Sequence, residues 1–355
     1  MQIELAAWLR LSLVPGLGGR GQRKLLAAFG LPQNIFSQSR ATLAAHIGEA
    51  LAERLLQHHD EAALAATTRW LETPAHRVLS LADREYPSAL LETDDPPIVL
   101  FVRGDPALLN KPAIAIVGSR NATAQGRLNA ENFAKVLGDA GFVIVSGLAL
   151  GIDTAAHRGA LSSSGGTIAV LGTGIDRAYP SSNAGLHDAI AERGLLISEF
   201  PLGTPPLSNN FPRRNRLISG LARGVLVVEA ALSSGSLITA KQAGEQGRDI
   251  YAIPGSIHSP FSRGCHALIR QGAKLVESAQ DILEELKVPN QAGTAPPSAL
   301  SPNPLIEHIG YDACSIDELC RRSGLTPESV SAMLLQLELS GGIAMLPGGM
   351  YQRLN

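Results

Sequence analysis

The sequence predicts an α/β fold: a doubly wound, mostly parallel sheet flanked by an N-terminal helical domain and a C-terminal winged-helix domain. Six short apolar runs between residues 113 and 255 each end in Gly or Ser or a small polar turn and are followed by a helical pattern, the alternation expected of βαβ units. Helical periodicity dominates residues 1–75, and residues 305–355 combine helical patterns with a short hairpin. These observations place domains at 1–75, 76–287 and 305–355.

The N-terminal region contains a tight glycine turn directly before a helical pattern. Pro15, Gly16 and Gly18 are the turn residues, and they leave backbone N–H groups exposed at the helix start. Three cations follow closely: Arg20, Arg23 and Lys24. The pattern resembles a SAM/helix-hairpin-helix-like turn that binds phosphate oxygens, and a simple glycine turn in a helical bundle explains it equally well.

The central region predicts six buried parallel strands, because its apolar runs are almost uninterrupted by polar residues. They are residues 113–119, 142–147, 166–172, 195–199, 224–230 and 249–255. A further apolar run at 98–102 is expected to add an edge strand.

The C-terminal region follows a stretch rich in Pro, Ser, Gly and Ala at 288–304, which predicts a flexible linker. Helical segments are then expected at 304–310, 315–324 and 326–341, before two short strands around Pro347, Gly348 and Gly349. Residues 303–355 carry a net of three negative charges. The predicted helix at 326–341, which would be the DNA-recognition helix of a winged-helix domain, has no Lys or Arg. We therefore expect a protein-contact or accessory role here rather than duplex reading.

Composition limits the classes of function. The 355 residues are 45% hydrophobic with a net charge of −2, so the chain is globular and lacks a strong overall positive field. No membrane-spanning run or signal-peptide pattern occurs, which predicts a cytoplasmic protein with no membrane partner. Cys265, Cys314 and Cys320 show no metal or disulfide spacing.

Short Gly and Ser loops follow the predicted strands, where ligands bind in an open parallel sheet. Gly118, Ser119 and Arg120 follow the first strand, and Ser233–Thr239 follows the fifth. Such loops direct backbone N–H groups toward an anion at a helix start. They predict a phosphate site that includes Ser234, Gly235 and Ser236.

Arginines occupy three stretches that contain no Asp or Glu, at residues 106–130, 200–228 and 250–276. The stretch between Glu199 and Glu229 holds Arg213, Arg214, Arg216 and Arg223. Phe211 lies beside this cluster, where its ring could stack on a base. If the fold is as predicted, these stretches form a local basic patch at one sheet edge.

Enzyme motifs are weak in this chain. It has no P-loop, and the GxG at Gly172–Gly174 follows the third strand rather than the first. His157 lies four residues after Asp153, a spacing that suits a catalytic pair but favours a helix-anchoring hydrogen bond. Asp176, Glu199 and Glu229 could polarise water, but we assign no catalytic residue, metal or cofactor.

Seven motifs in order resemble the DNA-processing protein A family (DprA, also called Smf). They are AIVGSR, SGLALGIDTAAHRGAL, AVLGTGIDRAYPSSN, SEFPLGTPP, FPRRNRLISGL, VVEAALSSGSLITAKQAGEQGRDIYAIPG and RGCHALIRQGAKLV. The resemblance implies an extended Rossmann-like domain and a non-enzymatic role in natural transformation: binding and protecting incoming single-stranded DNA, and loading a RecA-type recombinase as a homodimer.

The resemblance also implies roles for particular residues. Those implied to contact DNA are Gly118, Ser119, Arg120, Phe211, Arg213, Asn215, Arg216, Ser234, Gly235, Ser236 and Lys241, to which the basic patch adds Arg214. Those implied in self-association are His266, Leu268 and Ile269. The chain departs from some relatives in having no lysine at 208–210, so binding should depend more on the arginines.

Two other functions remain open. The chain also resembles the lysine-decarboxylase-like (LOG) phosphoribohydrolases at Ser234–Thr239, but Gln242 stands where that family has its catalytic Glu. A carboxamide cannot act as a general base. The other alternative is a structural DNA-compaction protein, which would bind DNA without stimulating a recombinase.

Overall fold

The computed structural model describes residues 3–288, 304–311, 313–346 and 348–354. The chain divides into two compact units, of which the first contains nearly all residues up to Val288 and the second contains the C-terminal elements. The predicted linker at 288–304 falls almost entirely outside the described residues, as does Pro347.

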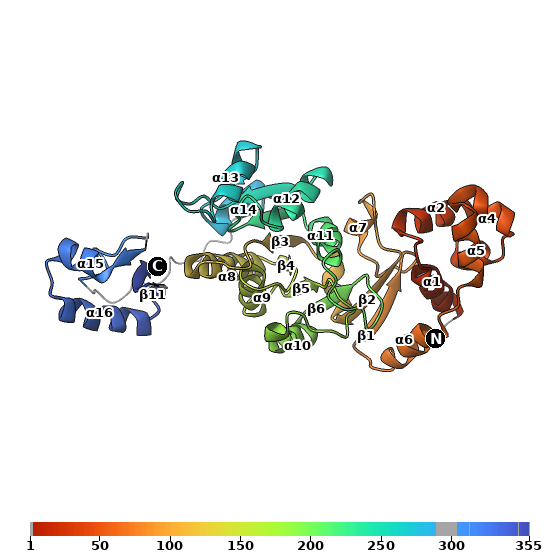
Figure 1. Ribbon diagram of the computed structural model, residues 1–355, viewed down its shortest axis with the longest axis horizontal. Helices are drawn as coiled ribbons and strands as arrows, with labels where there is room; N and C mark the ends of the chain where they lie inside the picture. The colour runs from red at the N-terminus through yellow and green to blue at the C-terminus, as the bar shows by residue number, and fades with distance from the viewer. Residues whose placement is uncertain (1–2, 289–303, 312, 347, 355) are drawn as a thin grey trace. The chain divides into compact units, whose positions relative to one another are not determined.

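A nine-stranded sheet forms the centre of the first unit (Figure 1), in the order β1-β2-β6-β5-β4-β3-β7-β8-β9. All six predicted strands are confirmed, and each pairs in parallel with the next of the six in the sheet. They are β3 (Ala113–Val117), β4 (Val143–Ser146), β5 (Thr167–Val170), β6 (Leu195–Ser198), β7 (Gly224–Val227) and β8 (Asp249–Ala252). The strand order reverses at β3, the first of these six strands along the chain, so β4 and β7 lie on either side of β3.

The expected edge strand at 98–102 is real but is not at the edge. It forms β2 (Val99–Gly104), which pairs antiparallel with β6 on one side and with β1 (His76–Ser80) on the other. Its apolar residues from Val99 to Val102 are buried, because alternate side chains pack into two core clusters. The sequence analysis missed β1, and it also missed the short β9 (Lys274–Leu275) at the opposite edge.

Helices cover both faces of the sheet, which confirms the doubly wound, mostly parallel architecture. Alternate residues of β3 show this: Ala115 and Val117 pack in a cluster with α11, α12 and α13, whereas Ile114 and Ile116 pack with α8, α9 and α14. The helices of this region are α7 (Ser88–Leu91), α8 (Ala124–Asp139), α9 (Ile152–Leu161), α10 (Ala184–Arg193), α11 (Asn210–Leu221), α12 (Ser236–Glu245), α13 (Arg263–Arg270) and α14 (Ala279–Glu285), with short 3₁₀ helices η1 (Pro106–Asn110) and η2 (Ser181–Asn183).

Six helices form the N-terminal region: α1 (Ile3–Leu13), α2 (Gly19–Phe29), α3 (Pro32–Phe36), α4 (Arg40–Ile47), α5 (Glu49–Gln57) and α6 (Glu61–Trp70). Their apolar residues share one core cluster with the sheet, so Trp8 and Leu25 belong to the same cluster as Phe101 of β2. This shared core attaches the N-terminal helices to the β1–β2 end of the sheet.

The predicted glycine turn lies between α1 and α2, where Gly16 adopts a positive φ of 83°. Two of the three cations near it are engaged within the protein. Arg23 pairs with the carboxylate of Asp95, and Lys24 Nζ donates to the carbonyl of His46 at 2.7 Å. The carboxylate of Asp95 thus lies beside the start of α2, where a phosphate would bind. Phosphate binding by this turn stays a prediction.

The second unit contains α15 (Ile316–Ser323), α16 (Pro327–Leu339) and a three-stranded sheet in the order β10-β12-β11. Its strands are β10 (Cys314–Ser315), β11 (Ile343–Leu346) and β12 (Met350–Arg353). The expected first helix at 304–310 is wrong, because residues 304–308 form turns. Leu305 in this segment and Ile309 just after it fill a separate small core. The remaining helix and hairpin order confirms the winged-helix prediction.

Candidate nucleic-acid interface

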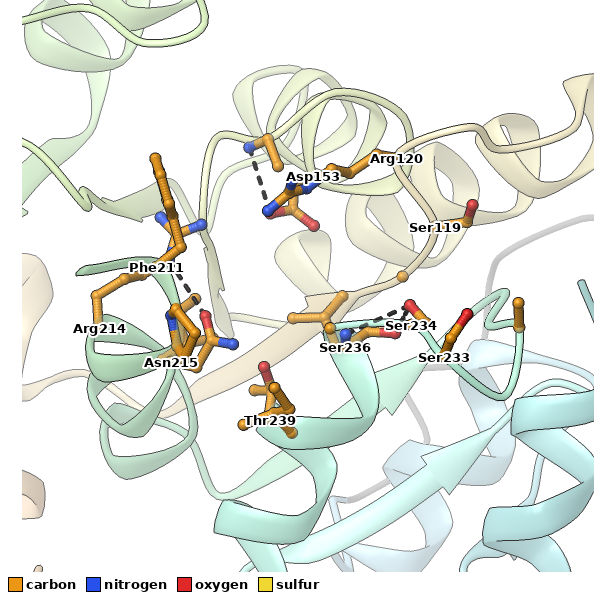
Figure 2. Close-up of a pocket in the computed structure, with 18 of the residues that line it drawn as sticks. Ser119, Arg120, Asp153, Phe211, Arg214, Asn215, Ser233, Ser234, Ser236 and Thr239 are labelled. Atoms are coloured by element: carbon orange, nitrogen blue, oxygen red, sulfur yellow. Dashed lines mark hydrogen bonds between the residues drawn. The ribbon is translucent and has the colours of Figure 1, made fainter. Parts of the chain in front are cut away.

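A cavity of about 660 Å³ opens at the carboxyl ends of the parallel strands. Its walls come from the loops after β3, β4, β5 and β7 together with α11 and the start of α12. Figure 2 shows Phe211, Arg214 and Asn215 of α11 on one side and Ser234 and Ser236 on the other. The predicted residues that line the cavity are Gly118, Ser119, Arg120, Phe211, Arg214, Asn215, Ser234, Gly235 and Ser236.

Helical geometry divides the basic motif of α11 between two faces. Phe211, Arg214, Asn215 and Ile218 line the cavity, and their spacing of three, four and seven residues is that of one helix face. Arg213 and Arg216 lie outside the lining and bind the buried carboxylate of Glu199, with Nη2–Oε2 distances of 2.8 and 2.7 Å. The structure therefore does not bring all three arginines into one patch.

Lys241 is also separate from this cavity. It lies on α12 with its side chain 78% exposed, 3.7 Å from Glu245. It borders a second cavity of about 570 Å³, whose other lining residues include Leu237, Ile250 and Leu268.

Two cations and another aromatic ring lie near the ring of Phe211. The guanidinium carbons of Arg120 and Arg214 are each 5.9 Å from its centroid. The Tyr179 ring lies 5.5 Å away and is tilted by 35°. A Cβ at Gly172 would lie only 2.7 Å from Phe211 Cδ1, so glycine there allows the ring to pack on the backbone after β5.

Arg214 is buried and mainly serves the protein backbone. Its Nη1 donates to the carbonyl of Gly147 at 2.5 Å and to the carbonyl of Val170, joining the ends of β4 and β5. Burial lowers the pKa of Arg214 to about 10, and the nearby Asp153 opposes that fall. The guanidinium stays charged at neutral pH and supplies a fixed positive charge beneath Phe211.

Arg120, in contrast, is exposed at the rim. Within the described part of the chain its guanidinium has no ion-pair partner, whereas Arg213 and Arg216 do. It is therefore the cation best placed to meet an incoming phosphate.

Asp153 and His157 anchor the loop between β4 and α9. Asp153 Oδ2 accepts hydrogen bonds from the N–H groups of Gly147 (3.1 Å) and Ala149 (3.3 Å). His157 Nε2 accepts from Leu148 N, and its Nδ1 lies 2.7 Å from Thr167 Oγ1. Burial lowers the pKa of His157 to about 3, so the ring is neutral. These bonds give both side chains the anchoring contacts that the sequence analysis favoured.

The opposite wall has the form expected of an anion site. Gly118 allows close approach of the loop after β3, since a Cβ there would lie 2.6 Å from Ile152 Cγ1. Ser234 Oγ and Ser236 Oγ lie 2.7 Å apart at the start of α12. Hydroxyl groups and the positive end of this ten-residue helix together favour a phosphate oxygen.

Sequence reasoning did not single out two of the lining residues, Asn121 and Tyr179, whereas Ser233 and Thr239 belong to the loop that it did name. Tyr179 is the more informative of the two missed residues, because it is 46% exposed although aromatic. An aromatic residue in the loop after the third predicted strand was the available signal.

The predicted self-association residues lie on α13 but differ in exposure. Leu268 is buried in the core of the first unit, whereas Ile269 is only partly buried. The ring of His266 lies 3.1 Å from the carbonyl of Gly255. Among the three, Ile269 offers the most accessible apolar surface.

Two other kinds of feature are absent from the described residues. These residues contain no helix long and apolar enough to cross a membrane and no cluster of His, Cys, Asp or Glu suited to a metal ion. The three cysteines are unpaired thiols. Gln242, the counterpart of the phosphoribohydrolase catalytic Glu, does not line the cavity.

Comparisons with known proteins agree with this architecture. The family model for DNA recombination-mediator protein A matches residues 77–287, and that for the DprA winged helix domain matches residues 289–349. Protein Smf of Escherichia coli is 45% identical over 297 residues, which cover 80% of this chain and 79% of that protein.

Two solved structures are also similar. DNA processing protein A from Streptococcus pneumoniae has a TM-score of 0.70 and 42% identity, covering 80% of this chain and 99% of that one. The protein from Helicobacter pylori, described for its single-stranded DNA binding mode, has a TM-score of 0.54 and 31% identity, covering 59% of this chain and 96% of that one. With a family model covering more than half of its length, this chain belongs to the DNA recombination-mediator protein A (DprA) family.

Proposed function

We propose that this chain binds single-stranded DNA in the cavity between α11 and α12, protects it from nucleases and loads a RecA-type recombinase onto it. The observation that carries the proposal is the position of Phe211, which has two guanidinium groups 5.9 Å from its ring centroid and shares the cavity lining with Ser234 and Ser236. An aromatic face beside phosphate-binding groups suits an unstacked base with its backbone.

The preference for a single strand follows from the site's shape and chemistry. The cavity of about 660 Å³ admits a base but not a duplex, and a base in a duplex has its faces occupied by its neighbours. Stacking and phosphate neutralisation are both tolerant of sequence. The H. pylori relative, described for binding single-stranded DNA, supports the same assignment.

We propose no catalytic step at this site. Of the described lining residues, Asp153 supplies the carboxylate, and two backbone N–H groups already bind its Oδ2 atom. Burial raises the pKa of Asp153, and Arg214 opposes that rise. The carboxylate thus holds the loop rather than facing a reactive water.

The test is fluorescence anisotropy with labelled oligo-dT and matched duplex across a salt series, using the full chain and a chain ending at Val288. We expect tight, salt-sensitive binding to the single strand, at least about tenfold weaker binding to duplex, and little change on removal of the acidic winged-helix unit. Equal affinity for duplex, or release of free base from AMP at ordinary turnover, would contradict the proposal. Added recombinase should form filaments faster on coated strands; no stimulation would favour DNA compaction instead.

We also propose that the chain acts as a homodimer that associates through α13. Ile269→Glu should place a charge on that partly buried apolar surface and shift the protein to a monomer, because an unpaired charge is costly in an interface core. Sedimentation velocity checks this, with exposed Ile238→Glu on α12 as the matched variant expected to stay dimeric. A dimeric Ile269→Glu protein would move the interface elsewhere.

A further inference from the structure

The face of α11 that points away from the cavity is held by an alternating series of charges. Arg216 pairs with two carboxylates: its Nη2 donates to Glu199 at 2.7 Å, and its Nε lies 3.2 Å from Asp95 Oδ2 in an ion pair without a hydrogen bond. Its Nη1 donates to the Asp95 carbonyl at 2.6 Å. Its side chain is 12% exposed. Arg213, half exposed, adds a second donor to the same oxygen of Glu199.

The series continues into the N-terminal helices. Asp95 pairs with Arg216 through its Oδ2 atom and with Arg23 of α2 through its Oδ1 atom. A Cβ at Gly19 would lie 2.7 Å from that Oδ1 atom, so the carboxylate packs closely on the start of α2. The order Arg213, Glu199, Arg216, Asp95, Arg23 thus connects α11 to α2.

We infer that Arg213 and Arg216 are positioning residues, which set the orientation of α11 through Glu199 and Asp95, and are not phosphate ligands. This inference rests on the proposed function, because its consequence is that Phe211 and Asn215 face the DNA site. It also makes the N-terminal helices a support for that site, through the contact between Asp95 and Arg23.

The energetics oppose removal of these arginines by DNA. The side chain of Glu199 is 2% exposed, and its Oε1 atom has no hydrogen-bond partner among the described residues. Burial raises the pKa of Glu199, and Arg216 and Arg213 oppose that rise. If a phosphate took both guanidinium groups, it would leave this buried carboxylate uncompensated, which is strongly unfavourable.

Glu199→Gln distinguishes the two roles, because they predict effects of opposite sign. If the arginines are positioning residues, loosening α11 lowers the oligo-dT affinity of the full chain by roughly two- to tenfold. The slope of log affinity against log salt then stays unchanged. If they are phosphate ligands, removing the acid frees Arg213 and leaves Arg216 held by Asp95 alone. The affinity then rises, and the slope steepens by about 0.7 per phosphate engaged.

Arg216→Gln gives an independent measurement. A positioning role predicts weaker binding with the wild-type salt slope, and a slope lowered by about 0.7 would overturn the inference. Glu92→Gln is the matched control, since Glu92 is an exposed acid that pairs with Arg248 on a neighbouring segment. It should leave affinity and slope as in the wild type.

Asp95→Asn decides the matter if Glu199→Gln fails to fold, because Asp95 is 43% exposed and tolerates the change more easily. We expect the same loss of affinity at constant slope, and wild-type affinity would overturn the inference. The wild-type chain is measured first. If it shows no salt-dependent binding to single strands, the proposed function fails; increased binding by Glu199→Gln overturns only the positioning roles.

Discussion

Arg120→Ala is expected to weaken binding to oligo-dT by roughly 10- to 150-fold, since a hydrogen bond to a charged group contributes about 1.5–3 kcal/mol. The guanidinium of Arg120 is exposed at the cavity rim and has no ion-pair partner in the described part of the chain. It can therefore bind a phosphate without leaving a buried acid unpaired. The loss should be similar for all base sequences, because phosphate contacts carry no sequence information.

The salt dependence identifies the kind of contact that Arg120 makes. Loss of one phosphate contact lowers the slope of log affinity against log salt by about 0.7 on a single strand. Fluorescence anisotropy across a salt series measures it, with Arg158→Ala on α9 as a control, because Arg158 is exposed but does not line the cavity. A folded Arg120→Ala protein with the wild-type slope would exclude the phosphate role.

Phe211→Ala is expected to lower affinity by about 1–3 kcal/mol, the contribution of one stacked base, or roughly 5- to 150-fold. The salt slope should remain that of the wild type, because no charge is lost. This separates the effect from that of Arg120→Ala. The measurement is the same titration, performed with oligo-dT and with a strand of equal length that carries abasic sites.

Abasic DNA provides the decisive comparison for Phe211. Without a base to stack, wild type and Phe211→Ala should bind the abasic strand with similar affinity. Gly172→Ala should reproduce the defect in a chain that retains Phe211, since the new methyl would lie 2.7 Å from the ring and displace it. An equal loss on normal and abasic strands would show that Phe211 supports the fold rather than a base.

Local patterns in the sequence were sufficient to predict the six parallel strands and to bring several predicted residues to one cavity. Continuous apolar runs such as 113–117 and 224–227 are needed to cover both faces of a parallel strand, so they identify β3 and β7 directly. Carboxyl ends of parallel strands meet at one edge. The Gly–Ser loops after β3 and β7 therefore had to converge, and Gly118, Ser119 and Ser234 do line one cavity.

The same reasoning could not place β1, because its burial depends on pairing with β2 and on the N-terminal helices packed against it. It also predicted a helix at 304–310 from apolar spacing that instead fills a small core from a turn. In both cases contacts between distant segments decided the local conformation.

The arginines show most clearly where sequence information ends. The sequence by itself determined that Arg213, Arg214 and Arg216 cluster in a stretch without acids, beside the aromatic residue Phe211. Only the tertiary structure brought Glu199 and Asp95 against two of them and buried the third on the carbonyls of Gly147 and Val170. Charge pairing depends on distance in space, and α11 directs neighbouring residues to different faces. A stretch that is free of acids along the chain is therefore not free of acids in the fold, which leaves Arg120 as the cation exposed at the rim.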